Sequence, residues 1–84
     1  MKTIYKYIYF KWMKDGAKTA EYACLSVSSD AHRGTVKWYG PWRQYCFFPH
    51  GNTVFNVGCL DDIKDFIGQL MDNRPKTLYD IYKD

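Results

Sequence analysis

The residues with the clearest chemical potential fall in one stretch of the chain, residues 34–49, which reads GTVKWYGPWRQYCFFP. Aromatic side chains two residues apart on a β-strand stand on one face, where nucleic-acid bases stack on them with about 1–3 kcal/mol each. Lysine and arginine side chains beside them can bind phosphate groups. The stretch therefore predicts a nucleic-acid-binding face, whose candidate residues are Lys37, Trp38, Trp42, Arg43, Tyr45 and Phe47.

The same aromatic residues also suit a hydrophobic core. A chain of 84 residues has room for one small domain, which buries only about 60% of the surface that the unfolded chain exposes. Aromatic residues make up 19% of the chain, and large rings are the main means of filling such a thin core. Composition favours a core role for Trp38, Phe47 and Phe48, so the orientation of these side chains decides between core and binding face.

Arg43 has two interpretations of its own. In the first, its guanidinium stacks on Trp42 and pairs with Asp61 or Asp62 near the start of a helix. In the second, it faces a binding partner. The sequence leaves both open.

Cysteine and histidine form a weaker candidate site. Cys46, His50 and Cys59 follow a C-x3-H-x8-C pattern, to which Cys24 or His32 could add a fourth ligand. Structural zinc sites usually consist of two closely spaced ligand pairs, and this chain offers at most one irregular pair. A cysteine nucleophile would need a strained elbow or a glycine-rich oxyanion loop, and neither has a signature here. We therefore expect no metal, no cofactor and no enzymatic activity.

Cysteine usage and hydropathy also bear on the compartment. The chain has three cysteines without a C-x-x-C pair, and Tyr5-Lys6-Tyr7 interrupts any apolar segment of a secretory signal. The chain contains no run of about 18 apolar residues, so no membrane span is expected. These observations predict free thiols in a reducing cytoplasm and no membrane partner.

Charge is distributed unevenly along the chain. Residues 1–58 contain eight Lys/Arg and three Asp/Glu (+5), whereas residues 59–84 contain four and six (−2), which together give the net charge of +3. The basic part coincides with the aromatic part. An anionic partner is therefore indicated, although the excess is smaller than in a typical nucleic-acid-binding domain.

The elements that must position these residues follow from hydrophobic periodicity and turn signals. Residues 1–58 are rich in β-branched and aromatic residues, with turns indicated at Lys14–Ala17, Gly40-Pro41 and Pro49–Asn52. In the first strand, alternation would place Tyr5, Tyr7 and Tyr9 on one face. Strands are predicted at residues 3–13, 19–28, 35–39, 42–48 and 53–57.

From Cys59 the apolar residues recur at helical spacing, which predicts an amphipathic helix over residues 59–74. Residues 75–84 would form a tail or a short helical turn. The predicted fold class is α+β: a single domain over residues 1–84, in which a curled antiparallel sheet of about four or five strands is packed by one C-terminal amphipathic helix.

Residues 34–71 resemble a group of small, uncharacterised proteins found in phages and prophages. Their shared core is K-W-Y-G-x-W-R-Q-Y-x-F-x-P, which this chain matches from Lys37 to Pro49. Segments of the form T-V-F and C-L-x-D-I follow, here at Thr53–Phe55 and Cys59–Ile63. The resemblance implies an α+β fold and a phage or mobile-element context, with the host cytoplasm as location, and it implies no known activity.

A shorter stretch resembles the nucleic-acid-binding strands of cold-shock domains, G-T-V-K-W-F followed by K-G-F-G-F. Residues 34–39 match the first strand, while Gln44 and Cys46 replace both glycines of the second. An amphipathic helix also stands where that family closes its barrel with two further strands. This resemblance implies that Lys37, Trp38, Arg43, Tyr45 and Phe47 stack on or bind single-stranded nucleic acid.

Two functional hypotheses follow. In the first, the chain is a small, non-enzymatic binding module that contacts nucleic acid, single-stranded or within a nucleoprotein complex, through a basic-aromatic sheet face. In the second, it is a phage-type inhibitor or adaptor that binds a host protein. The candidate surface for a protein partner, or for a homodimer, consists of Tyr5, Tyr7 and Tyr9.

Overall fold

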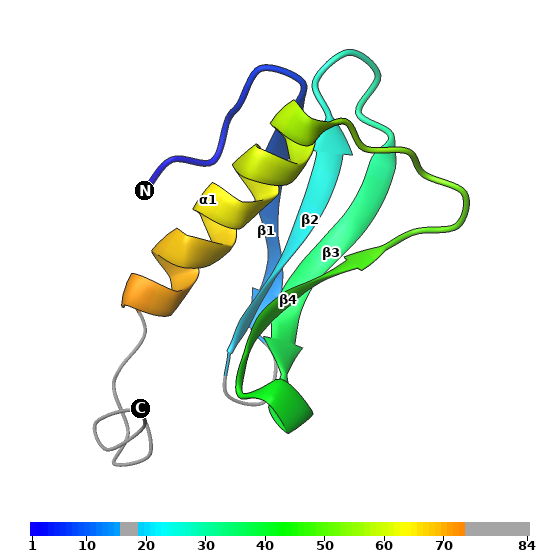
Figure 1. Ribbon diagram of the computed structural model, residues 1–84. Coiled ribbons are helices and arrows are strands. Elements are labelled where there is room, and N and C mark those ends of the chain that lie inside the picture. Colours follow the sequence, from blue (N-terminus) through cyan, green and yellow to red (C-terminus); the bar gives the residue numbers. More distant parts are fainter. Residues whose placement is uncertain (16–18, 74–84) are drawn as a thin grey trace.

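The chain folds into one antiparallel sheet with a helix laid across one of its faces (Figure 1). The structure is a computed structural model that describes residues 1–15 and 19–73. Its elements are β1 (Ile8–Asp15), β2 (Ala20–Ser26), β3 (His32–Tyr39), the 3-10 turn η1 (Gly40–Trp42), β4 (Gln44–Pro49) and α1 (Val57–Asn73). The strands lie in the order β1-β2-β3-β4, each antiparallel to the next. The predicted α+β class, an antiparallel sheet of about four or five strands with a C-terminal helix packed on it, is confirmed with four strands in an unclosed sheet.

The pairing register assigns alternate residues to opposite faces of the sheet. Cys24 lies opposite both Phe10 and Gly34, and Val36 lies opposite Phe47. These side chains point towards α1, so we call this side the helix face and the opposite side the open face. The side chains of the helix face and of α1 form the core, in which Phe66, Val36 and Cys24 are fully buried.

The helix closes the core with a regularly spaced apolar stripe, Cys59, Ile63, Phe66 and Leu70. The ring of Phe66 stacks on that of Phe10, with ring centroids 4.0 Å apart. The predicted helix is confirmed, but it starts at Val57 rather than at residue 59. The reason is an asparagine N-cap: the amide of Cys59 donates to Asn56 Oδ1 (2.8 Å), which satisfies a free donor of the first turn.

The predicted fifth strand over residues 53–57 is wrong. Residues 53–56 have no regular secondary structure, and Val57 already belongs to α1. The side chain of Val54 is 79% exposed, so its β-branched character is not used for packing. The start of the fourth strand is also wrong by two residues, because Gly40–Trp42 form the 3-10 turn η1, and β4 begins at Gln44.

The predicted first strand is too long at its N-terminal end. The chain reverses between Thr3 and Phe10: the amide of Tyr5 donates to the carbonyl of Ile8 (2.9 Å), and that of Phe10 donates to the carbonyl of Thr3 (2.8 Å). This reversal turns Tyr5 into the core, where it is 8% exposed. Its hydroxyl donates to Asp65 Oδ2 on α1 at 2.7 Å. Burial, followed by this hydrogen bond, raises the pKa of Tyr5 above its usual value.

The shared face expected for three tyrosines is therefore not formed. Tyr5 is buried, Tyr7 is 49% exposed within the reversal, and Tyr9 lies in β1, where its hydroxyl donates to Asp30 Oδ1 at 2.7 Å. A surface that combines Tyr5, Tyr7 and Tyr9 does not exist in this arrangement. The predicted tail over residues 75–84 lies outside the described residues.

Candidate nucleic-acid interface

The sheet separates the six candidate residues into two groups. Trp38, Tyr45 and Phe47 belong to the helix face. Trp38 and Tyr45 are paired across β3 and β4, their rings meet edge to face with centroids 5.4 Å apart, and Tyr45 is only 7% exposed. Phe47 contacts the ring of Phe55 at 5.2 Å, and both Trp38 and Phe47 pack against the core. These three residues contribute to packing. Composition favoured that role for Trp38 and Phe47, but its extension to Phe48 is wrong, because the register places Phe48 on the open face.

The other three candidates are accessible. Lys37 alternates with Trp38 and so lies on the open face, with its Nζ atom 4.7 Å from the centroid of the Phe48 ring. Trp42 is 65% exposed in η1. Arg43 is exposed and has a left-handed backbone conformation (φ 52°, ψ 47°), which ends the turn before β4. Figure 1 shows this turn at the opposite end of the sheet from the start of α1. Asp61 and Asp62, the carboxylates expected to pair with Arg43, follow the first turn of that helix.

The open face adds two aromatic residues that were not among the candidates. The ring of Tyr39 meets that of Trp42 edge to face at 5.0 Å and that of Phe48 at 6.0 Å. Tyr39 and Phe48 are half-buried, and both lie on the open face by the register. We name this group of side chains the open-face cluster: Lys37, Tyr39, Trp42 and Phe48.

Strict alternation could have found these two residues. Aromatic residues occupy the consecutive positions 38 and 39 in one strand and 47 and 48 in the next, so each strand must place aromatic rings on both faces. The six candidate residues came from both faces of the sheet. Assigning alternate residues of each strand to opposite faces would have placed Tyr39 and Phe48 on the same face as Lys37.

Further basic and polar side chains extend the open face. Lys11 on β1 is exposed and lies opposite Ala23, on the same side as Lys37. At the other end of β3 and β4, the rings of His32 and His50 lie 4.0 Å apart. Glu21 on β2 is an acidic residue of this face. The open face thus presents a row of rings along β3 and β4 with lysines beside it.

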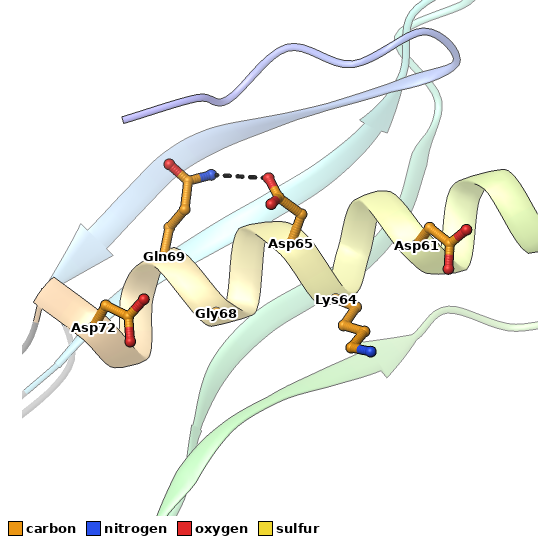
Figure 2. A pocket seen from close by; sticks show the side chains of 6 residues that line it. All are labelled: Asp61, Lys64, Asp65, Gly68, Gln69 and Asp72. Atoms are coloured by element: carbon orange, nitrogen blue, oxygen red, sulfur yellow. Dashed lines mark hydrogen bonds between the residues drawn. The ribbon is translucent and has the colours of Figure 1, made fainter.

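The opposite side of the molecule is acidic. A shallow hollow of about 410 Å³ lies along α1. Figure 2 shows the side chains that line it, among them Gln69, which donates to Asp65 (3.5 Å). All of its lining residues come from this one helix: Asp61, Lys64, Asp65, Gly68, Gln69 and Asp72. Three carboxylates against one lysine repel a polyanion. Charge therefore distinguishes the two sides, with the basic residues on the sheet and the acidic residues on the helix.

The three cysteines are free thiols. Burial raises the pKa of Cys24 to about 12, with a further increase from the nearby Cys59. Burial also raises the pKa of Cys46. Raised pKa values keep thiols protonated and poorly nucleophilic, which gives them a packing role. Among the described residues no group of three metal-ligating side chains comes together.

No helix within the described ranges has the length and apolar character that crossing a membrane requires.

Comparison with known proteins gives one relevant similarity. The chain is 35% identical over 69 residues to an uncharacterised 9.3 kDa protein of Acholeplasma phage L2, and the match covers 82% of this chain and 86% of the phage protein. No family model matches the chain, and no solved structure matches it.

Proposed function

The chain belongs to the same family as the Acholeplasma phage L2 protein, and from this premise we propose that it is a small non-enzymatic module that binds single-stranded nucleic acid through its open face. The observation that carries the proposal is the open-face cluster. The ring of Tyr39 contacts those of Trp42 and Phe48 on a sheet face that no other element of the described residues covers, and Lys37 lies over the Phe48 ring. Rings of this kind stack on unpaired bases whatever their identity.

Single strands suit this surface better than duplexes do. Phe48 and Tyr39 are half-buried, so a flat base laid on the sheet can reach the faces of their rings, whereas a rigid nucleic-acid duplex cannot. In a duplex the bases are stacked on one another and unavailable to protein rings, whereas a single strand can splay its bases. The backbone of such a strand would follow Lys11 and Lys37, and its phosphates would avoid the acidic side of α1.

The direct test is fluorescence anisotropy with labelled single-stranded DNA, single-stranded RNA and duplex DNA at two salt concentrations. We expect single strands to bind more tightly than duplex, with affinity that falls as salt rises. Each phosphate neutralised contributes a slope of about −0.7 in a plot of log affinity against log salt. Absence of binding at low salt, or binding that salt does not weaken, would contradict the proposal.

Two variants that remove the same charge from different surfaces test whether nucleic acid binds at the open face. Lys37→Gln removes one positive charge from the open-face cluster, and Lys64→Gln removes one from the helix. We expect Lys37→Gln to weaken binding and to reduce the salt slope by about 0.7, because one phosphate contact is lost. Equal effects of the two substitutions would mean that net charge, rather than the open face, drives binding.

The second candidate function, an inhibitor or adaptor that binds a host protein, rests on a different observation. β1 is an edge strand of the sheet, and Trp12 and Met13 on it are 55% and 44% exposed. Exposed apolar residues on an edge strand are typical of a surface that pairs with another chain. Capture from host lysate, repeated after nuclease treatment, separates the two functions: loss of capture supports nucleic acid, and retention of one protein supports the alternative.

A further inference from the structure

A second cavity, separate from the open-face cluster, lies where the start of β1, the end of β2, the start of β3 and the segment before α1 meet. It has a volume of about 270 Å³. Among the residues that the structure describes, its lining contains one charged residue, Arg33, and no carboxylate. The residues around it are Tyr7, Ile8, Ser26, Arg33, Val54, Phe55, Asn56 and Cys59.

Arg33 contacts the segment before α1, and among the described residues no carboxylate lines its cavity. A β-bulge at this point of β3 leaves Arg33 without a partner in the register, since Gly34 pairs with Cys24 and His32 pairs with Leu25. The Nη2 atom of Arg33 donates to the carbonyl of Val54 (2.6 Å), and its guanidinium lies 5.4 Å from the centroid of the Phe55 ring.

Most of the hydrogen-bonding capacity of this guanidinium is unused. The Nε atom is buried and has no hydrogen-bond partner among the described residues. A guanidinium has five N–H donors, and the bond to Val54 uses one of them, so donors on the Nη atoms remain for an anion in the cavity. A charged group held between an aromatic ring and a carbonyl, without a carboxylate in its cavity, is the arrangement that a small oxyanion would complete.

Two neighbouring features favour the same ligand. The Nζ atom of Lys6 lies 5.1 Å from the centroid of the Tyr7 ring, and Tyr7 lines the cavity, so a second positive charge stands near the cavity. Hydroxyl and amide groups of Ser26 and Asn56 supply neutral polar contacts. The amide of Cys59 is already bound by Asn56 Oδ1, so the start of α1 is capped and Arg33 is the principal anion-binding group.

We propose that this cavity is a phosphate-binding site in which Arg33 is the principal ligand. The group bound is either free phosphate or the terminal phosphate of a nucleotide or oligonucleotide, which share the same chemistry. The site lies near the start of α1, whereas η1 and the Trp42 end of the open-face cluster lie at the other end of the sheet (Figure 1). It does not depend on the function proposed for the open face.

The test is a titration of the ¹⁵N-labelled protein with inorganic phosphate at constant ionic strength, followed by amide chemical shifts. We expect saturable shifts for residues around the cavity, among them Cys59 and Ser26. Arg33→Gln should weaken binding by at least about tenfold, because it removes a charge-assisted contact. Arg33→Lys should recover only part of the affinity, since lysine keeps the charge but cannot reproduce the planar donor set.

Lys64→Gln is the control, because it lowers the net charge by the same amount on the far side of α1. Shifts that do not saturate, or that Arg33→Gln and Lys64→Gln reduce equally, would overturn the site. If Arg33→Gln fails to fold, the wild-type titration and the Arg33→Lys variant still decide the question. A 5′-phosphorylated oligonucleotide compared with its unphosphorylated form identifies the source: cavity shifts specific to the phosphorylated strand assign a terminal phosphate, and shifts with inorganic phosphate alone assign the free ion.

Discussion

The two faces of the sheet are built from the same kinds of residue, but α1 covers only one of them. On the helix face, Val36 and Tyr45 are buried beneath α1, with Trp38 and Phe47 packed at the edge of the core. On the open face, the ring of Tyr39 contacts those of Phe48 and Trp42, and nothing covers them in the described residues. Aromatic content by itself therefore says nothing about binding, and the decisive property is the face on which each ring lies.

This difference also explains why an 84-residue chain has aromatic residues on its surface as well as in its core. One helix covers only one face of a four-stranded sheet, and the core on that face is completed by rings from both layers, such as the stacked Phe10 and Phe66. We expect substitutions on the helix face to reduce stability and substitutions on the open face to reduce binding.

The largest effect is expected at the centre of the helix face. Phe66→Ala removes a fully buried ring that stacks on Phe10 and should lower the free energy of unfolding by about 3–5 kcal/mol. Urea denaturation followed by circular dichroism measures this change. If the variant does not fold, Phe66→Leu gives a smaller loss of the same sign. A loss below about 1 kcal/mol for Phe66→Ala, the size typical of surface changes, would mean that the helix face is not the core.

A smaller loss of stability is expected at Gly34, where β3 passes under an aromatic ring. A Cβ atom added there would meet the ring of Phe47 and would lie 2.9 Å from the carbonyl oxygen of Phe48. Gly34→Ala should therefore destabilise the protein by about 1–3 kcal/mol through overpacking. Gly40→Ala is the matched control, because nothing lies within 4 Å of its added Cβ. Similar losses in the two variants, measured by urea denaturation, would count against the close packing of Phe47 on the helix face.

Two exposed tryptophans test the open face directly. Trp42 (65% exposed) belongs to the open-face cluster, whereas Trp12 (55% exposed) lies opposite Tyr22 in the register of the helix face. Trp42→Ala should weaken binding of single-stranded nucleic acid by about 5- to 150-fold, the equivalent of about 1–3 kcal/mol for one stacked base. Trp12→Ala should leave affinity nearly unchanged. Anisotropy titrations in which both substitutions weaken binding equally would remove the distinction between the faces.

The smallest effect concerns pH and the helix face. Because burial raises the pKa of Cys24 to about 12, its thiol stays protonated in the folded protein at pH values where the unfolded chain loses the proton. The contribution of this thiol to the free energy of unfolding is fully present below pH 9.0, the pKa of the thiol in the unfolded chain. It decreases as pH rises towards 12, by at most about 1.4 kcal/mol per pH unit. Urea denaturation between pH 8 and pH 10 should show a shallower decrease for Cys24→Ala than for the wild type. Tyr5 is present in both proteins, so its own raised pKa cancels in the comparison. Parallel pH profiles would show that Cys24 is not shielded from solvent.

Much of the fold could be predicted from local pattern. The amphipathic stripe that contains Ile63, Phe66 and Leu70 predicts α1, because its residues recur at helical spacing. The turns at Gly40-Pro41 and around Gly51 are indicated by residues that interrupt a strand or favour positive φ, and Gly51 has a φ of 44°. The errors fall at element ends. Because Asn56 is the N-cap, the helix starts two residues earlier than expected. A chain reversal before β1 places Tyr5 in the core rather than in the strand.

The sequence by itself determined that residues 34–49 contain two alternating sets of rings and that a single amphipathic helix follows them. Only the tertiary structure decided which set the helix covers, and so made Trp38, Tyr45 and Phe47 part of the packing and left Lys37, Tyr39, Phe48 and Trp42 on the surface. It alone also brought Arg33 to Phe55 and to the start of α1. The physical reason is that alternation is a local property of a strand, whereas coverage of one face depends on contacts between segments far apart in the chain, such as Phe10 with Phe66 and Tyr5 with Asp65.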